Sequence, residues 1–314
     1  MAAALYDPEF GYYATQIRDV GRTGDFTTSA QGNSPLGQAI ARWAKDQKKR
    51  FRFDFHWHLV EVGGGTGEMA ATILQSLGIF GRLGLTYHLV EISQPLRQRQ
   101  KEKLRGRNVR WHDSIADALQ AAEGMALIFS NELVDAYPCR RLRRVGSEWH
   151  EIGLKLECGQ IQESCRPLLE CVAALPENQI IEVHAAYREE LLKTAPLLTR
   201  GAWLTIDYGD IFPALYHRQP QGTVRGYFHH QRVEGAEIYT RIGQQDLTAD
   251  VNFTDLQNWG AEAGLANDLL ETQREFITRH LGHLTPETTG EARVLDPIGA
   301  GSAFKVLQQS RSTA

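Results

Sequence analysis

The sequence has no long hydrophobic run and no recognisable targeting segment. None of its 314 residues belong to an uninterrupted apolar run of about 18, so no membrane span is expected. Residues 1–13 contain neither a basic stretch nor an apolar core, so we expect no secretory signal, and they do not resemble an Arg-rich transit peptide. We therefore expect a cytoplasmic protein, or a mitochondrial-matrix protein if the source is eukaryotic and the chain is processed.

Cysteine is scarce, and no two cysteines form a CxxC pair. The chain has Cys139, Cys158, Cys165 and Cys171. A chain of this length can bury a large core without disulfides, so we expect reduced thiols. The formal charge is −4, and the dense basic run is confined to residues 45–52. That run is typical of a solvated helix end, and no nucleic-acid partner is expected.

Signatures of metal and covalent chemistry are also missing. His56, His58 and the adjacent pair His229 and His230 have no cysteine or carboxylate at metal-ligand spacing, so no metal is expected. No G-x-S-x-G elbow indicates a covalent nucleophile.

Strands and helices alternate through the first half of the chain. Strands are predicted before the glycines at 63–65 and at 86–92, 109–112 and 126–130, and helices at 66–77, 94–104 and 114–122. Such alternation predicts an α/β fold with a mostly parallel, doubly wound sheet covered on both faces.

The pattern changes after Pro138. Short antiparallel strands with turns near Gly146 and Gly159 are predicted, and this segment is an insertion. The alternation resumes with a helix at 185–198 and a strand at 201–209. A turn-rich polar stretch follows at 210–245, then a helix at 253–264 and a closing strand at 303–308.

These shifts divide the chain into four parts. We predict an N-terminal lid or substrate segment (1–54), the ligand-binding half of a Rossmann-like domain (55–138), the antiparallel insertion (139–178) and the remainder of that domain (179–314). The last part includes a substrate-side insertion at about 210–250.

The glycine-rich loop after the first predicted strand is the most informative motif. It contains Gly63, Gly64, Gly65 and Gly67. A dinucleotide loop requires a third glycine where Glu68 stands, and no Gly-Lys-Ser/Thr follows to make a phosphate loop. The remaining pattern, G-x-G-x-G with Glu61 two residues before it, is the loop of class I S-adenosylmethionine methyltransferases. It suits a cationic ligand without phosphate, because glycines let the loop approach closely. A tight turn without a ligand is the alternative.

Later strand ends supply further candidate ligands for the donor. Glu91 ends the second predicted strand, where a carboxylate can accept hydrogen bonds from ribose hydroxyls, and Ile92 is assigned to the same site. Asp113 and Ser114 follow the third strand, where an adenine amino group could be met. Helix capping is the alternative for these positions.

Motifs along nearly the whole chain resemble one family. They are LYDPEFGYY, GDFTTSAQGNSPLGQAIA, VEVGGGTGE, YHLVEIS, SNELVDAYP, IDYG, GTVRGY, QDLTADVNFTDL and AFKVLQ. In this order they resemble the MidA-like methyltransferases, whose mitochondrial members are complex I assembly factors. The resemblance implies a class I fold, S-adenosylmethionine as cofactor and, for mitochondrial members, methylation of an arginine on a respiratory-complex subunit. Asp250 stands where family members often carry histidine.

Acidic residues at two strand ends are the candidates for catalysis. Guanidinium stays protonated at neutral pH, and carboxylates can hold its planar fork. Asn131, Glu132 and Asp135 follow the fourth strand, and the spacing predicts that Glu132 and Asp135 share a face of one helical turn. Glu132 would be the guanidinium clamp, Asp135 a second clamp or structural partner, and Asn131 a donor or substrate ligand. Simple capping of the turn is the alternative.

Asp207 and Tyr208 end another strand and complete the candidate site. Asp207 could extend the acidic cluster, and Tyr208 could line the methyl pocket; a buried Asp capping a loop is the alternative. Thr28 and Ser29 belong to a polar loop that we interpret as a lid over the donor, with helix capping by Ser34 and Pro35 as the alternative.

Three functions fit these patterns. The first is a protein arginine methyltransferase, the second a small-molecule methyltransferase, and the third a non-catalytic assembly factor that binds S-adenosylmethionine. The stretch Ser-Asn-Glu-Leu lacks the proline pair and stacking aromatic of enzymes that methylate bases. The insertion could also mediate a homodimer through the apolar residues Trp149, Ile152, Leu154 and Leu156, or these residues could equally pack on the parent domain.

Overall fold

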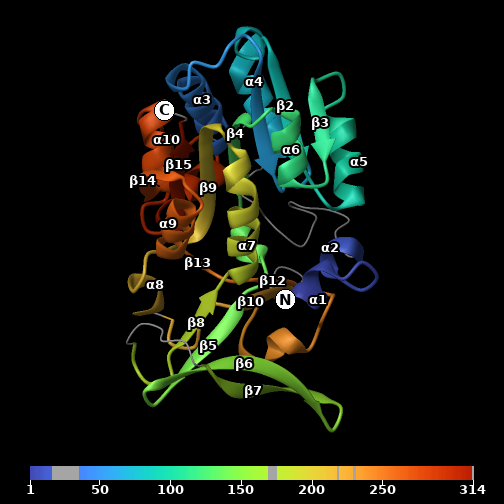
Figure 1. Cartoon of the computed structure of the whole chain (residues 1–314), viewed down its shortest axis with the longest axis vertical. Coiled ribbons are helices and arrows are strands. Elements are labelled where there is room, and N and C mark those ends of the chain that lie inside the picture. The colour runs from blue at the N-terminus through green and yellow to red at the C-terminus, as the bar shows by residue number, and fades with distance from the viewer. Residues whose placement is uncertain (16–34, 169–174, 218, 229–230, 313–314) are drawn as a thin grey trace. The chain divides into compact units, whose positions relative to one another are not determined.

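The computed structural model describes residues 1–15, 35–168, 175–217, 219–228 and 231–312 (Figure 1). Thr28 and Ser29, with the rest of the expected lid loop, lie outside the described residues, as do Cys171, His229 and His230. In the described part of the chain, no helix is both long and apolar enough to cross a membrane.

The chain forms two compact units. The smaller unit comprises Met1–Gln16, Val134–Glu189 and Gly209–Thr254, and the larger unit comprises Ile17–Leu133, Glu190–Tyr208 and Asp255–Ala314. Each unit is therefore built from segments that are distant in the sequence.

The larger unit contains a mixed sheet with the strand order β14-β15-β9-β4-β1-β2-β3. Strands β9, β4, β1, β2 and β3 pair in parallel, and β15 pairs antiparallel with both β9 and β14. The predicted α/β, mostly parallel Rossmann-like architecture is confirmed. Its elements are α3 (Pro35–Arg50), β1 (Trp57–Val62), α4 (Glu68–Gly81), β2 (Leu85–Val90), α5 (Gln94–Lys103), β3 (Val109–His112), α6 (Ile115–Ala121), β4 (Met125–Asn131), η2 (Ala195–Leu197), β9 (Arg200–Asp210), α9 (Phe253–Glu262), β14 (Ala266–Thr272), α10 (Gln273–Leu281), α11 (Thr289–Leu295), α12 (Ala300–Ala303) and β15 (Phe304–Arg311).

Alternating side chains of β1 and β2 form the two faces of this sheet. Leu59 and Leu89 point into a core shared with Ile40 of α3 and Ile73 of α4. Burial of these apolar side chains fixes the strand register, because a shift of one residue would expose all of them. The parallel strands consequently end together at one edge of the sheet, where the polar candidates follow them.

The smaller unit is mainly antiparallel. One sheet has the order β7-β6-β5-β8 and another the order β11-β10-β12. The predicted turns at Gly146 and Gly159 are present, with φ of 62° and 77°. Its elements are α1 (Ala2–Tyr6), α2 (Tyr12–Thr15), η1 (Val134–Ala136), β5 (Arg140–Val145), β6 (Glu148–Glu157), β7 (Gln160–Leu168), β8 (Ile180–Val183), α8 (Ala214–His217), β10 (Arg225–Phe228), β11 (Gln231–Val233), η3 (Gly235–Tyr239), β12 (Asp246–Thr248) and β13 (Val251–Asn252), and α7 (Ala185–Thr194) begins in it.

Candidate functional site

The glycine loop between β1 and α4 is shaped by both packing and backbone conformation. A side chain at Gly63 would meet the Cδ1 atom of Leu133 at 2.9 Å, and one at Gly64 would meet the Cδ2 atom of Leu89 at 2.4 Å. Gly65 has φ of 50°, yet a Cβ there would meet no atom of the described residues within 4 Å. Gly63 and Gly64 are therefore required by the protein itself, whereas Gly65 faces open space that a ligand can approach.

Glu61 lies beneath this loop and is fully buried. Its Oε2 atom accepts a hydrogen bond of 2.6 Å from the hydroxyl of Tyr87. Burial raises the pKa of Glu61 to about 8, although the Tyr87 hydroxyl opposes that shift. Glu61 contacts β2 directly, so in this structure it braces the loop from below.

Gln100 of α5 connects three parts of the site, and our sequence analysis did not identify it. Its Nε2 atom donates to the carbonyl of Gly65 at 2.7 Å and to Oε2 of Glu91 at 3.2 Å. Its Oε1 atom accepts from Nε1 of Trp111 at 3.0 Å. One buried amide thus holds the glycine loop, the carboxylate after β2 and strand β3 in fixed relation.

Glu91 keeps acceptor capacity beyond these contacts. Its Oε1 atom accepts from the backbone N–H of Ser93 at 2.9 Å, and its Oε2 atom accepts from Gln100. A carboxylate offers about four lone-pair sites, which leaves room for a diol. Burial raises the pKa of Glu91, and the Ser93 and Gln100 hydrogen bonds oppose that shift. The adjacent Ile92 is 60% exposed, as suits an apolar surface for a planar ligand.

Asp113 and Ser114 have protein partners at the start of α6. Asp113 forms an ion pair of 2.6 Å with Arg97, and the side chain of Ser114 caps α6 by accepting from the backbone N–H of Asp117. Ser114 therefore caps α6, as the alternative interpretation predicted. Binding of adenine by Asp113 or Ser114 stays a prediction.

The loop after β4 has an unusual backbone conformation. Glu132 has φ of 53°, which residues other than glycine rarely adopt. Its N–H donates to the carbonyl of Ile206, and the next N–H, of Leu133, donates to Oδ2 of Asp207 at 3.2 Å. Asn131 Nδ2 donates to Oε1 of Glu132 at 3.3 Å.

The expectation that Glu132 and Asp135 share one helical turn is wrong. The left-handed backbone of Glu132 interrupts any helix, and the short 3-10 turn begins only at Val134. Asp135 is buried in the smaller unit, where its carbonyl accepts from the N–H of Ala249. Tyr208 packs edge-on against Phe304 at 5.5 Å in the larger unit.

The residues of the larger unit fit S-adenosylmethionine in three respects. Gly65 leaves an open cradle beside the loop. The Oδ1 atom of Asn131 is buried and has no hydrogen-bond donor among the described residues, so it could accept from the donor's ammonium group. Glu91 could receive the ribose hydroxyls. These assignments remain proposals.

A row of histidines crosses the face of the sheet opposite the main core. His58 of β1, His88 of β2 and His112 of β3 are joined by ring-nitrogen contacts of 2.9 and 2.8 Å. Burial lowers the pKa of His88 to about 3. Within the described ranges, no three His, Cys, Asp or Glu side chains are placed to hold a metal ion.

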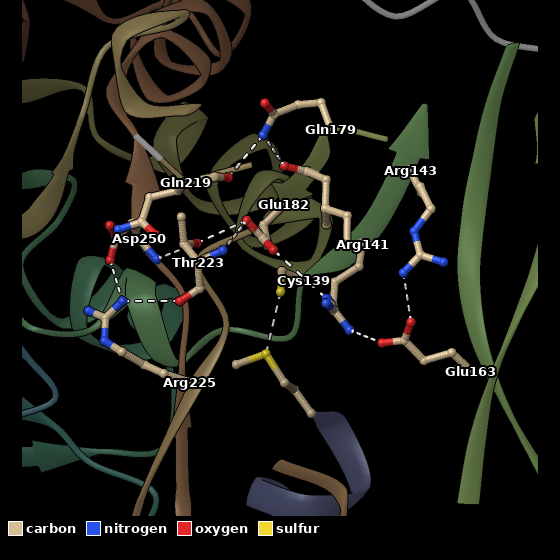
Figure 2. Close-up of polar contacts among 12 residues, drawn as sticks. Cys139, Arg141, Arg143, Glu163, Gln179, Glu182, Gln219, Thr223, Arg225 and Asp250 are labelled. Carbon is tan, nitrogen blue, oxygen red and sulfur yellow. Dashed lines mark hydrogen bonds and ion pairs between the residues drawn. The ribbon is translucent and has the colours of Figure 1, made fainter. Parts of the chain in front are cut away.

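The smaller unit contains a network of charges that the sequence analysis also missed (Figure 2). Buried Glu182 accepts from the N–H and the hydroxyl of Thr223, at 3.0 and 2.9 Å. Arg225 forms an ion pair of 2.5 Å with Asp250, and the N–H of Asp250 donates to the Thr223 hydroxyl. Asp250 thus neutralises a mostly buried arginine.

The fold and the glycine loop define a class I methyltransferase architecture, and comparison with known proteins agrees. Residues 37–269 match the family described as "Putative S-adenosyl-L-methionine-dependent methyltransferase". This match covers more than half of the chain, and the chain belongs to that family. The prediction drawn from its ordered motifs is confirmed: it is an S-adenosylmethionine-dependent methyltransferase.

Solved structures and curated relatives resemble the chain over most of its length. A protein from Burkholderia thailandensis bound to S-adenosyl-homocysteine superimposes with a TM-score of 0.85 and is 28% identical, covering 99% of this chain and 86% of that one. Protein arginine methyltransferase NDUFAF7, mitochondrial, of Danio rerio is 27% identical over 312 residues, 88% of this chain and 71% of the relative. The Drosophila melanogaster homolog is 24% identical, over 98% of this chain and 79% of the relative.

Proposed function

We propose that the chain transfers methyl groups to an arginine side chain of another protein. That protein would be a subunit of the respiratory-complex type. The observation that carries this proposal is the near full-length similarity to relatives named protein arginine methyltransferases. Identity of about a quarter leaves the acceptor itself open to experiment. Those relatives are named mitochondrial, and by analogy we propose a matrix-like compartment if the source is eukaryotic.

The end of β4 supplies the carboxylate chemistry that an arginine acceptor needs. S-adenosylmethionine, when bound, supplies a methyl group on a sulfonium. Transfer would form the N–C bond as the S–C bond breaks, with the bonding electron pair left on sulfur, and the guanidinium would release one N–H proton to water. Glu132 is proposed to hold the guanidinium fork and to aim one nitrogen at the methyl carbon.

The fixed backbone around Glu132 supports this role. Residues held in sparsely populated backbone conformations are often found at active sites. Here two backbone hydrogen bonds, to Ile206 and Asp207, keep Glu132 in the left-handed region. Asp207 receives N–H groups with both oxygens, from Leu133 and Tyr208, so we propose that it positions Glu132. For Asp135 and Tyr208 the proposed roles are a second clamp and a lining of the methyl pocket.

We further propose that the antiparallel sheet containing β5, β6, β7 and β8 presents the protein substrate. Substrate-binding surfaces in such folds are commonly added to a rigid scaffold as insertions.

A labelled-donor experiment tests the proposal. The purified chain is incubated with tritiated S-adenosylmethionine and host lysate, and labelled protein is hydrolysed to identify the modified amino acid. Radioactive methylarginine is the expected product. Label confined to small molecules would favour the second candidate, and donor binding without any transfer would favour the non-catalytic factor.

A further inference from the structure

Four large apolar side chains are exposed at the end of the larger unit where its parallel strands begin. Phe80 is 87% exposed, Ile79 72%, Phe55 61% and Leu83 48%. We call these four residues the apolar tip. Single exposed apolar residues are ordinary, whereas a group of them on adjoining loops is typical of an interaction surface.

A glycine in α4 creates half of this tip. Gly78 has φ of 66° and ψ of −177°, so the helical geometry breaks there. The chain then makes a new turn, in which the N–H of Arg82 donates to the carbonyl of Gly78 at 3.2 Å. Before the break, Ile73 and Leu77 are buried against the sheet, and after it Ile79 and Phe80 point into solvent.

The link between α3 and β1 supplies the other half. The N–H of Trp57 donates to the carbonyl of Gly84 at 3.0 Å, and a Cβ at Gly84 would meet the carbonyl oxygen of Phe55 at 1.8 Å. Phe55 therefore lies against the turn that carries Phe80 and Leu83. Figure 1 shows the end of α4 and this link at the top of the view.

Basic residues lie on the segments that carry or adjoin the apolar tip, namely the end of α3, its link to β1 and the turn after α4. A Cβ at Gly81 would lie 3.0 Å from Cε of Lys45, which places the end of α3 beside the turn. These basic residues, which we call the basic rim, are Lys45, Lys48, Lys49, Arg52 and Arg82. Among the residues that the structure describes, none of these five forms an ion pair with a carboxylate, although the exposed Asp54 lies on the same link.

The sign of this charge is opposite to that of the whole chain. The formal net charge is −4, whereas the rim places five cations on the segments that carry or adjoin the apolar tip. Long lysine and arginine side chains beside exposed apolar groups match the interface of an anionic bilayer, in which headgroups meet the cations and acyl chains receive the apolar groups. A folded protein partner would more commonly meet a flat patch with fewer lysines.

We propose that the apolar tip and the basic rim dock the larger unit on an anionic lipid surface. The inserted groups are Phe80 and Ile79, with Phe55 and Leu83 at the headgroup level. The tip lies at the start of β1, and the glycine loop follows its end at Val62. A strand of six residues spans roughly 17 Å, so docking leaves the proposed donor loop in water.

Vesicle flotation with the full chain tests this proposal. We expect the protein to float with vesicles of phosphatidylcholine mixed with phosphatidylglycerol, and not with vesicles of phosphatidylcholine alone. Added salt should weaken the binding, because the Lys49 and Arg52 side chains are exposed and salt screens exposed charges. Ile79→Ser combined with Phe80→Ser should lower the partition coefficient at least tenfold. Lys49→Gln and Arg52→Gln should each lower it about fivefold.

Matched control variants distinguish lipid docking from nonspecific hydrophobic binding and from misfolding. Ile298→Ser removes a side chain that is 92% exposed elsewhere in the larger unit, and it should float like the wild type. Circular dichroism and S-adenosylmethionine titration should be unchanged in all variants. If the Ile79 and Phe80 variant does not fold, the Lys49 and Arg52 variants decide the question.

Several results would overturn the proposal. They are absence of flotation with the mixed vesicles, equal flotation with pure phosphatidylcholine, and flotation that the tip and rim substitutions leave intact. Capture of a soluble protein by the tip, without vesicle binding, would also reject the lipid assignment. None of these results bears on methyl transfer to arginine, which the labelled-donor experiment tests separately.

Discussion

The buried carboxylate of Asp207 accepts a hydrogen bond of 3.2 Å from the backbone N–H of Leu133. Its second oxygen accepts from the N–H of Tyr208 at 3.0 Å. The end of β9 is thereby joined to the loop after β4, whose residue Glu132 has a left-handed backbone. Asp207 can therefore influence methyl transfer without contacting a substrate.

Asp207→Asn should loosen this loop. The amide keeps one acceptor oxygen but turns an NH₂ group toward a backbone N–H, so one buried donor loses its partner. Such a loss costs about 1–3 kcal/mol. We expect a lower melting temperature and a lower kcat, with nearly unchanged affinity for S-adenosylmethionine. Asp210→Asn, on the same strand, is the control, and equal kcat in the two variants would contradict the positioning role.

Glu132→Gln should leave donor binding intact and slow transfer. The neutral amide cannot pair with a guanidinium as a carboxylate does, and a tenfold loss in kcat corresponds to about 1.4 kcal/mol of barrier. Steady-state kinetics and calorimetry measure the two quantities. Glu102→Gln, at an exposed position of α5 in the larger unit, is the matched control. Wild-type turnover in the Glu132 variant would remove this residue from the catalytic site.

Gly65→Ala should separate backbone strain from ligand exclusion. Among the described residues the added Cβ meets no atom within 4 Å, so the stability cost should be only the left-handed penalty of about 1–2 kcal/mol. Gly106→Ala is the control, since Gly106 also has positive φ, at 77°, and open space around it. Both variants should lose similar stability, but only Gly65→Ala should lose donor affinity. Equal affinity in both would show that the loop does not bind the donor.

Gln100→Leu should weaken donor binding through Glu91. Without the amide, one oxygen of Glu91 loses its donor and the carbonyl of Gly65 loses its partner. We expect at least a tenfold loss in affinity for S-adenosyl-homocysteine, and little loss for an analogue that lacks the ribose hydroxyls. Gln98→Leu, on the exposed side of the same helix, should bind both ligands normally. A uniform loss for both ligands would indicate only general loosening.

Acid should destabilise the larger unit through His88. Its folded pKa of about 3 lies below the usual value of 6.5, so the folded state binds fewer protons than the unfolded state. The contribution of neutral His88 to the free energy of unfolding is therefore fully present above pH 6.5. It decreases as the pH falls from 6.5 toward 3. His88→Gln preserves a donor and an acceptor without titrating, so its unfolding free energy should fall less between pH 7 and pH 5. Identical pH dependence in both proteins would exclude this contribution.

The parallel half of the sheet was predictable because its residues repeat with clear periods. Strand β3 has the predicted limits, and the predicted strand at 201–209 lies within β9. Strands β8 and β14 and helix α10 were not predicted. β14, with the sequence ANDLLET, carries polar residues at a sheet edge, where one side of the strand faces solvent and the apolar pattern is weak.

Two features of the candidate site left little trace in the sequence. The left-handed backbone of Glu132 results from contacts with β9, which lies more than sixty residues away in the chain. Gln100 did leave one signal, since it lies midway between Leu96 and Leu104 at four-residue intervals along the buried side of α5. A polar residue inside an apolar stripe indicates a buried hydrogen-bonding role.

The contact between Gly63 and Leu133 has an evolutionary consequence. The Cδ1 atom of Leu133 occupies the space that any side chain at position 63 would need. A larger residue at 63 should therefore survive selection only together with a smaller residue at 133, and asparagine, which tolerates positive φ, is the first substitution to expect. Natural variants of this chain should show correlated replacement at these two sites.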